Sequence, residues 1–114
     1  MKKLFITLSI LLSFSTLTAQ EDFNGIWGSD DTSYLTTIIA TEYKVMKVFN
    51  TSFVEHRVIT EDIINQKDNV FTTELYNELN GYSVTIEYSL KNKDTLIQKY
   101  SKDLKGEYLL TRLY

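Results

Sequence analysis

Residues 82–90, YSVTIEYSL, alternate between large side chains at every even position and small or polar side chains at every odd position. Because successive side chains of a β-strand point to opposite faces of a sheet, this pattern predicts a strand with one buried and one exposed face. Looser versions of the same pattern recur along the chain, separated by turn-forming residues. They predict further strands at residues 25–28, 34–40, 43–49, 53–59, 61–66, 70–76, 95–100 and 107–113.

The short spacing of the predicted strands limits how they can be connected. They follow one another at intervals of about 8 to 12 residues, whereas a parallel crossover needs a connection of about a dozen residues or more. Consecutive strands are therefore expected to pair antiparallel. The sequence predicts an all-β fold, a single small antiparallel meander of about eight short strands, either closed into a barrel or folded into a sandwich.

Residues 72–81, TTELYNELNG, fit a second pattern, a short helix with one apolar face that ends at Gly81. We prefer a strand followed by a turn, because Val70, Phe71 and the adjacent threonines favour strands. The dipeptide Asn80-Gly81 is also typical of a hairpin turn. A helix in this segment would instead indicate an α+β roll.

The first twenty residues have the features of a secretory signal peptide. Two lysines precede an apolar run from Leu4 to Leu17, and the small residue Ala19 follows. The run is about 14 residues long, shorter than the roughly 20 that a membrane-spanning helix needs, so stable membrane insertion is not expected. We expect residues 1–19 to be a signal peptide cleaved near Ala19, and residues 20–114 to form one domain exported to the periplasm or the extracellular space.

Composition limits how this domain is stabilised and what it binds. The chain has no cysteine, so packing and backbone pairing must stabilise it without disulfides. Its eight tyrosines, six phenylalanines and single tryptophan supply large side chains for a core. Beyond the two N-terminal lysines, the chain has ten basic and fifteen acidic residues, a formal net charge of −5. An acidic surface argues against binding to nucleic acid or anionic membranes. We expect the domain to be a monomer.

The residues required for most catalytic and metal chemistry are missing. The only histidine, His56, has no glycine-flanked serine beside it that would indicate a nucleophile, and there is no cysteine. The acidic pairs Asp30-Asp31 and Glu61-Asp62 lack the spacing of a calcium loop, and a single histidine does not indicate a zinc site. We therefore expect no enzymatic activity, no metal and no cofactor.

The segment Gly25-Ile26-Trp27 contains the only tryptophan, and Arg112 lies on the last predicted strand. This combination resembles the lipocalin-like barrels of the calycin group, in which a G-x-W sequence opens the first strand and a basic residue of the last strand packs over the tryptophan. The resemblance extends over the whole predicted domain and implies a closed or nearly closed lipocalin-like barrel. It assigns Gly25, Trp27 and Arg112 to barrel closure, and a guanidinium over an indole adds about 0.5 to 2 kcal/mol. The alternative is an ordinary core tryptophan and an unrelated surface arginine.

The chain is shorter than the proteins it resembles, and it lacks the disulfide and the C-terminal helix that many of them have. Strands of five to eight residues span only about 17 to 27 Å, and eight of them enclose an interior that side chains nearly fill. A wide ligand cavity is therefore not expected.

The resemblance implies an exported carrier that holds a small apolar ligand in the mouth of the barrel. The expected wall of that site is formed by Phe71, Leu75, Val84, Ile86 and Tyr88, with tyrosine hydroxyls as the few polar contacts. One alternative is a protein-binding module, such as an inhibitor of an exported hydrolase, which would use loops or residues 21–24. Another is a structural domain without a ligand. An empty cavity well above about 300 Å³ would favour the carrier, and a solid interior would favour the protein-binding module.

Overall fold

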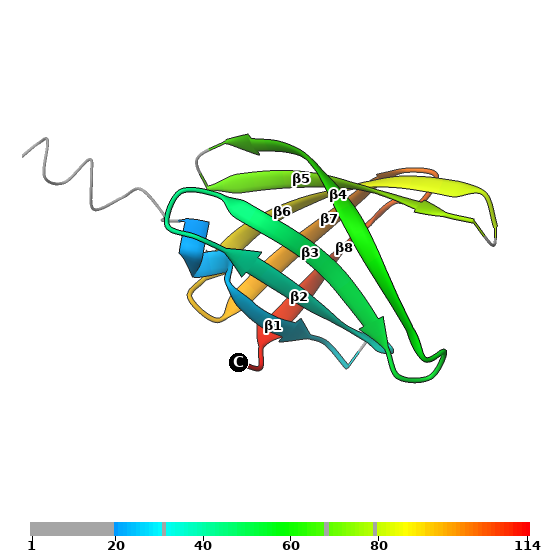
Figure 1. The fold of residues 1–114 in the computed structure, drawn as a ribbon, viewed down its shortest axis with the longest axis horizontal. Helices are drawn as coiled ribbons and strands as arrows, with labels where there is room; N and C mark the ends of the chain where they lie inside the picture. Colours follow the sequence, from blue (N-terminus) through cyan, green and yellow to red (C-terminus); the bar gives the residue numbers. More distant parts are fainter. Residues whose placement is uncertain (1–19, 31, 68, 79) are drawn as a thin grey trace, which may run out of the picture.

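The computed structural model describes residues 20–30, 32–67, 69–78 and 80–114. Eight antiparallel strands follow one another in chain order around one closed barrel (Figure 1). They are β1 (Gly25–Gly28), β2 (Tyr34–Ala40), β3 (Val45–Ser52), β4 (Arg57–Lys67), β5 (Val70–Asn77), β6 (Tyr82–Asn92), β7 (Thr95–Lys102) and β8 (Gly106–Arg112), preceded by a 3-10 helix, η1 (Gln20–Phe23). The predicted all-β meander is confirmed, and it is a barrel. The described residues include no helix with the length and apolar character needed to cross a membrane. The predicted signal peptide, residues 1–19, lies outside the described residues.

The first and last strands close the ring. β1 pairs with β2 on one side and with β8 on the other, and Trp27 lies opposite Arg112 in this second pair. The chain end extends the seam, because the N–H of Leu113 donates to the carbonyl of Ile26 at 2.8 Å. Figure 1 shows the C-terminus beside β1. The closing contact therefore joins two segments that lie at opposite ends of the domain sequence.

The structure differs from the prediction in the middle of the chain. Residues 53–56 form a turn instead of the start of a strand, and β4 is one strand of 11 residues where two short ones were predicted. Val58, which contributed to the predicted apolar pattern, is 64% exposed on the outer face. Within β4 the register shifts between Ile63 and Asn65. Such a bulge moves the inward positions of the strand from odd to even numbers.

The segment that also fitted a helix is a strand. β5 pairs with β6 along its full length, from Val70 opposite Ser89 to Asn77 opposite Tyr82. The turn that follows contains Gly81 at φ 75°, and its N–H donates to the carbonyl of Asn77 at 2.8 Å. A glycine adopts this left-handed conformation without steric cost, as the hairpin prediction required.

The inward faces of the strands form a single core. Alternation in β6 gives Val84, Ile86 and Tyr88 exposed fractions of 6%, 0% and 0%. The buried apolar residues of the whole core are Phe23, Trp27, Ile38, Val45, Val48, Phe71, Val84, Ile86, Tyr88, Leu96 and Leu110. The N-terminal η1 contributes to this core through Phe23, so the segment before the first strand is part of the packed domain.

The barrel has two unlike ends, which we call the base and the mouth. The base is the end with η1, the C-terminus and the turns at residues 41–44 and 93–94. The mouth is the opposite end, with the β3–β4 turn at residues 53–56, the β7–β8 turn at residues 103–105, and the β1–β2 and β5–β6 connections.

The wall of the barrel is split at the mouth between β4 and β5. Their ladder ends with Asp62 opposite Glu74, so that residues 57–61 have no partner in β5 within the described chain. Figure 1 shows β4 diverging from β5 toward the mouth. A groove of about 320 Å³ follows this split and is lined by residues 57–60 and 75–78.

Candidate functional site: a cavity at the mouth of a plugged barrel

The base is plugged by aromatic side chains. Trp27 is fully buried, and its indole N–H donates to the carbonyl of Phe23 at 2.9 Å. The ring of Phe23 meets Phe71 edge-on, with a centroid distance of 4.9 Å. Phe71 in turn stacks on Tyr88 at 4.6 Å. These rings form a continuous aromatic column from the base into the interior.

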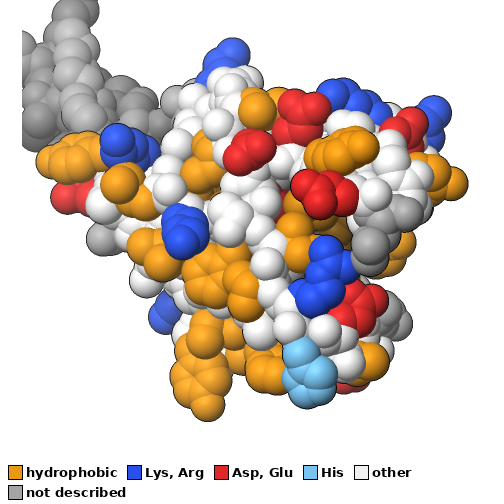
Figure 2. Space-filling model, turned by 45° about the vertical axis from the view of Figure 1, so that its right-hand side comes forward, with side chains coloured by type: hydrophobic (Ala, Val, Ile, Leu, Met, Phe, Trp, Pro, Cys, Tyr) orange, Lys and Arg blue, Asp and Glu red, His pale blue; other side chains and the backbone are white. Residues whose placement is uncertain are grey.

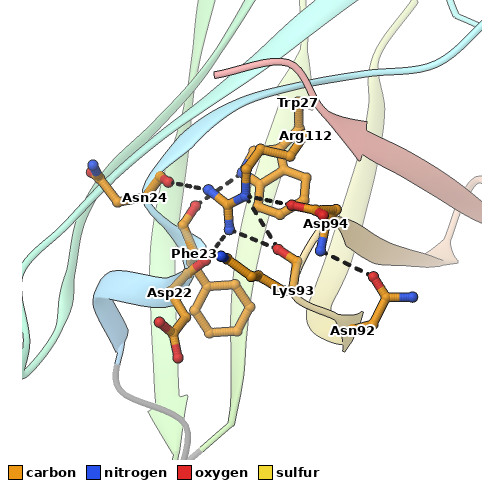
Figure 3. Close-up of polar contacts among 8 residues, drawn as sticks. All are labelled: Asp22, Phe23, Asn24, Trp27, Asn92, Lys93, Asp94 and Arg112. Atoms are coloured by element: carbon orange, nitrogen blue, oxygen red, sulfur yellow. Dashed lines mark hydrogen bonds and ion pairs between the residues drawn. The ribbon is translucent and has the colours of Figure 1, made fainter.

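Arg112 covers the plug and binds the chain segments around it (Figure 3). Its guanidinium carbon lies 4.2 Å from the centroid of the Trp27 ring. The same group donates to the carbonyls of Asn24 and Asp22, each at 2.6 Å, and to the carbonyl of Lys93. A guanidinium presents several donors in a rigid fork while its face stays on the indole, which a lysine ammonium cannot do. Arg112 therefore joins the N-terminal segment, the β6–β7 turn and β8.

Gly25 lies in the remaining space beneath this arginine. Its φ is 150°, a conformation that side-chain-bearing residues rarely adopt. A Cβ atom at this position would collide with the carbonyl oxygen of Tyr114 and with the Arg112 guanidinium. The structure thus brings Gly25, Trp27 and Arg112 together, as the resemblance implied.

At the mouth, a cavity of about 260 Å³ opens inside the barrel. Its apolar wall comes from Ile59, Leu75, Val84 and Leu104. Its polar lining includes Asn50, Tyr34 and Tyr100, and its charged residues are Glu55 and Arg57. The hydroxyls of Tyr34 and Tyr100 lie 2.9 Å apart and share a hydrogen bond. The cavity therefore combines an apolar wall with a few convergent polar groups, the general composition of small-molecule sites.

The five residues predicted to form the ligand wall lie at two depths. Leu75 and Val84 line the cavity. Phe71, Ile86 and Tyr88 are fully buried and do not line it. Alternation identified the inward face correctly but carries no information about height along the barrel axis.

The sequence analysis did not identify which residues form the polar part of the site. Asn50, Tyr34 and Tyr100 all occupy inward positions of strands, and Asn50 is 9% exposed. A polar residue within an otherwise apolar inward series, such as Asn50 two places after Val48, is the signal that could have identified the site. A buried polar side chain needs hydrogen-bond partners, so its presence predicts a polar cluster inside the barrel.

Beneath the cavity, Glu61 accepts hydrogen bonds from three strands. It is 3% exposed, and its Oε1 accepts from the hydroxyls of Thr73 at 2.6 Å and Tyr88 at 2.7 Å. Its Oε2 accepts from the side-chain amide of Asn50 at 2.6 Å. Asn50 in turn accepts from the hydroxyl of Thr36 at 2.7 Å. These bonds cross-link β2, β3, β4, β5 and β6 through the interior.

Burial and the negative charge of Glu61 raise the pKa values of three tyrosines inside the barrel. Burial of the Tyr88 hydroxyl raises its pKa well above 10.0, and the negative charge of Glu61 adds to the rise. The pKa values of Tyr34 and Tyr100 are also raised, mainly by burial and further by the Glu61 charge. All three hydroxyls therefore stay neutral at physiological pH, so that Tyr88 can donate to Glu61 and one of Tyr34 and Tyr100 can donate to the other.

The groups considered for catalysis or metal binding do not converge. His56 lies exposed in the β3–β4 turn at φ 53°. In the described part of the chain, no group of three or more His, Cys, Asp or Glu side chains is placed to hold a metal ion. Asp31 lies outside the described residues, and Glu61 and Asp62 point to opposite faces of β4, one buried and the other exposed.

No protein-family model, curated protein or solved structure matches the chain. The closed barrel of eight antiparallel strands, with an arginine over a plugging tryptophan, is compatible with a lipocalin-like fold.

Proposed function

We propose that this protein is an exported, non-catalytic domain of lipocalin-like type that binds a small, largely apolar molecule in the mouth of its barrel. The observation that carries the proposal is the composition of the mouth cavity, an apolar wall with a cluster of polar groups, because its volume of about 260 Å³ lies below the roughly 300 Å³ that would favour a carrier by size alone. The plugged base supports it, because the buried Trp27 fills that end and leaves the open space of the barrel at the mouth.

The size of the cavity limits the ligand. Its volume of about 260 Å³ falls below the roughly 300 to 1,000 Å³ of typical small-molecule sites. A compact molecule with one ring or a short chain fits inside, whereas a long lipid would leave most of its chain outside the mouth. Burying about 150 Å² of apolar ligand surface contributes about 4 kcal/mol, and part of this offsets the entropy lost on association. Affinities in the micromolar to millimolar range are expected.

A substitution that fills the cavity tests this proposal. Leu75 lines the cavity, so Leu75→Trp is expected to weaken the binding of small amphiphiles at least about tenfold. Leu109→Trp is the matched control, because Leu109 is 49% exposed on the outer face of β8. Binding is measured by chemical-shift titration with a panel of small aromatic and aliphatic compounds. If no compound shifts the amides around the cavity, or if Leu75→Trp and Leu109→Trp bind equally, the proposal fails.

A second function, binding of a protein partner, is favoured by the surface around the β4–β5 split. Val58 and Tyr76 border the groove and are 64% and 61% exposed, and Phe53 and Val54 of the neighbouring turn are 65% and 76% exposed. Figure 2 shows hydrophobic side chains exposed at this end of the molecule, beside the histidine of the turn. Free strand edges bordered by apolar residues are used by proteins that accept an extended peptide as an additional strand.

Capture experiments distinguish the two functions. Immobilised protein is expected to retain a partner from an exported fraction if the split is an interface, and Tyr76→Lys should abolish retention while leaving small-molecule binding intact. Retention that survives Tyr76→Lys, or no retention at micromolar protein, would remove this second function.

Export is part of the proposal and rests on the sequence of residues 1–19. N-terminal sequencing of protein recovered outside the cytoplasm is expected to begin near Gln20. An intact N-terminus in the cytoplasmic fraction would contradict it.

A further inference from the structure

We propose that Glu61 determines which ligands the mouth cavity accepts, favouring compounds whose inner end is a cation or a hydrogen-bond donor and excluding carboxylates. This inference rests on the proposed function and names the chemical class of the ligand.

The charges around the cavity leave Glu61 uncompensated. Two charged residues line the cavity, Glu55 and Arg57, and they form an ion pair at 3.6 Å in which the carboxylate is 60% exposed and the guanidinium 38% exposed. Their charges cancel at the rim, where solvent also screens them. Glu61 lies inside the barrel, 3% exposed, and its hydrogen-bond partners are all neutral. Within the described chain, no Lys, Arg or His forms an ion pair with it.

The geometry of the network fits an ionised carboxylate. Both oxygens of Glu61 accept hydrogen bonds, at 2.6 to 3.0 Å, from one amide and two hydroxyl groups. A carboxylate accepts several such bonds without offering a donor. With Glu61 ionised, a negative charge lies inside the barrel, balanced by dipoles and by no opposite charge among the described residues.

Asn50 connects this charge to the ligand space. It lines the cavity, donates to Glu61 at 2.6 Å and accepts from Thr36 at 2.7 Å. One amide side chain thus separates the cavity from the carboxylate. At such short range, in an environment less polar than water, a charge acts strongly on a ligand group. An ammonium at the inner end of the ligand is attracted, and a carboxylate in the same place is repelled.

The interior also has more acceptors than donors. Gln98 is fully buried on β7 and donates to the hydroxyl of Tyr88 at 3.1 Å. Its Oε1 has no hydrogen-bond partner among the described residues. An interior with an unpaired acceptor, and with a carboxylate that offers no donor, matches a ligand that brings donors of its own.

A matched series of three probes tests the inference on the wild-type protein. Phenethylammonium, phenethyl alcohol and phenylacetate have similar size and carry a positive charge, no charge and a negative charge. At physiological salt, we expect the ammonium to bind at least about tenfold more tightly than the alcohol, and the carboxylate to bind more weakly than both. Chemical-shift changes at Asn50, Leu75 and Val84 locate the binding in the mouth, which separates it from unspecific attraction to the acidic surface.

Two variants assign the effect to Glu61. In Glu61→Gln, the ratio of ammonium to alcohol affinity should fall to about one, and this ratio is the readout because any loss of shape in the mouth weakens both probes alike. Glu55→Gln is the control, because it removes an equal charge at the exposed rim and should change the ratio less than about threefold.

The outcomes separate this inference from the proposed function. If the three probes bind in the mouth with equal affinity, or if phenylacetate binds most tightly, the role of Glu61 is wrong and ligand binding stands. If none of the three binds in the mouth at millimolar concentration, ligand binding itself is contradicted. Should Glu61→Gln not fold, the wild-type ranking of the three probes decides the question alone.

Discussion

The base and the mouth belong to the same ring of strands but are completed by different interactions. At the base, a buried tryptophan fills the barrel, and one arginine binds the backbone carbonyls of two segments that are distant in sequence. At the mouth, two neighbouring strands separate, polar groups face an apolar wall, and a cavity of about 260 Å³ remains open. The base is thus built for stability, and the mouth leaves space and unpaired strand edges.

The difference shows how a short chain can close a barrel and still keep a site. Interior apolar side chains are concentrated toward the base, where they exclude water without needing partners. The polar residues of the interior form a hydrogen-bonded network around Glu61 that gives the mouth a fixed shape. A buried hydrogen-bonded network of this kind is rigid, because its members hold one another in place.

The largest expected effect comes from removing the plug. Trp27→Ala is expected to lower the free energy of unfolding by about 3 to 5 kcal/mol, because it leaves a large cavity in a fully buried site. Tyr82→Ala at the mouth is the matched comparison, and since Tyr82 is 50% exposed its cost should stay below about 1 kcal/mol. Chemical denaturation measures both. Similar losses at the two sites would remove the distinction between base and mouth.

The two arginines provide the next comparison. Arg112→Met is expected to cost about 2 to 3 kcal/mol, since it leaves the carbonyls of Asp22, Asn24 and Lys93 without their charged donor. Arg57→Met at the mouth removes only an exposed ion pair and should cost less than about 0.5 kcal/mol. Urea titration of both variants checks this, and an inverted order would show that the base does not depend on the arginine.

A smaller difference is expected between two glycines that both have positive φ. Gly25→Ala places a methyl group against the Tyr114 carbonyl and Arg112, so strain and collision together should cost about 2 kcal/mol or more. Gly81→Ala at the mouth meets no atom within 4 Å and should cost only about 1 kcal/mol for its backbone conformation. Thermal denaturation compares the two. Equal losses would mean that the close approach at the seam is unimportant.

The smallest expected effect is on the free energy of unfolding at alkaline pH, and it comes from two tyrosines at the mouth. The pKa values of Tyr34 and Tyr100 are raised in the folded barrel, so above about pH 10 the unfolded chain loses these protons while the folded protein keeps them. Their contribution to stability is therefore constant below pH 10 and decreases as the pH rises further. The double variant Tyr34→Phe and Tyr100→Phe should show a shallower decrease in denaturation experiments between about pH 10 and 12. An unchanged slope would contradict burial of these hydroxyls.

Much of the fold could be predicted from the sequence because it depends on local patterns. The alternation of residues 82–90 and the Asn80-Gly81 turn are contained in short segments, and the structure has a strand and a hairpin turn there. Connections as short as these can join only antiparallel neighbours, so the strands must form an antiparallel meander. The bulge in β4 was not predictable in this way, since it depends on how the neighbouring strand curves.

The site was less predictable, because it depends on depth and on partners. Phe71 and Leu75 occupy equivalent inward positions of β5, yet only Leu75 lines the cavity. The role of Glu61 depends on donors from three other strands, and nothing in the local sequence around residue 61 identifies them. Only the register of the closed ring places these groups together.

Amide hydrogen exchange measured residue by residue by NMR tests the contrast between base and mouth most directly. We expect the amide of Leu113, which donates across the seam to Ile26, to exchange only through global unfolding. Alternate amides of residues 57–61, which face the split, should exchange at least about a hundredfold faster. Equal protection of both segments, or faster exchange at the seam than at the split, would contradict a barrel that is sealed at its base and open at its mouth.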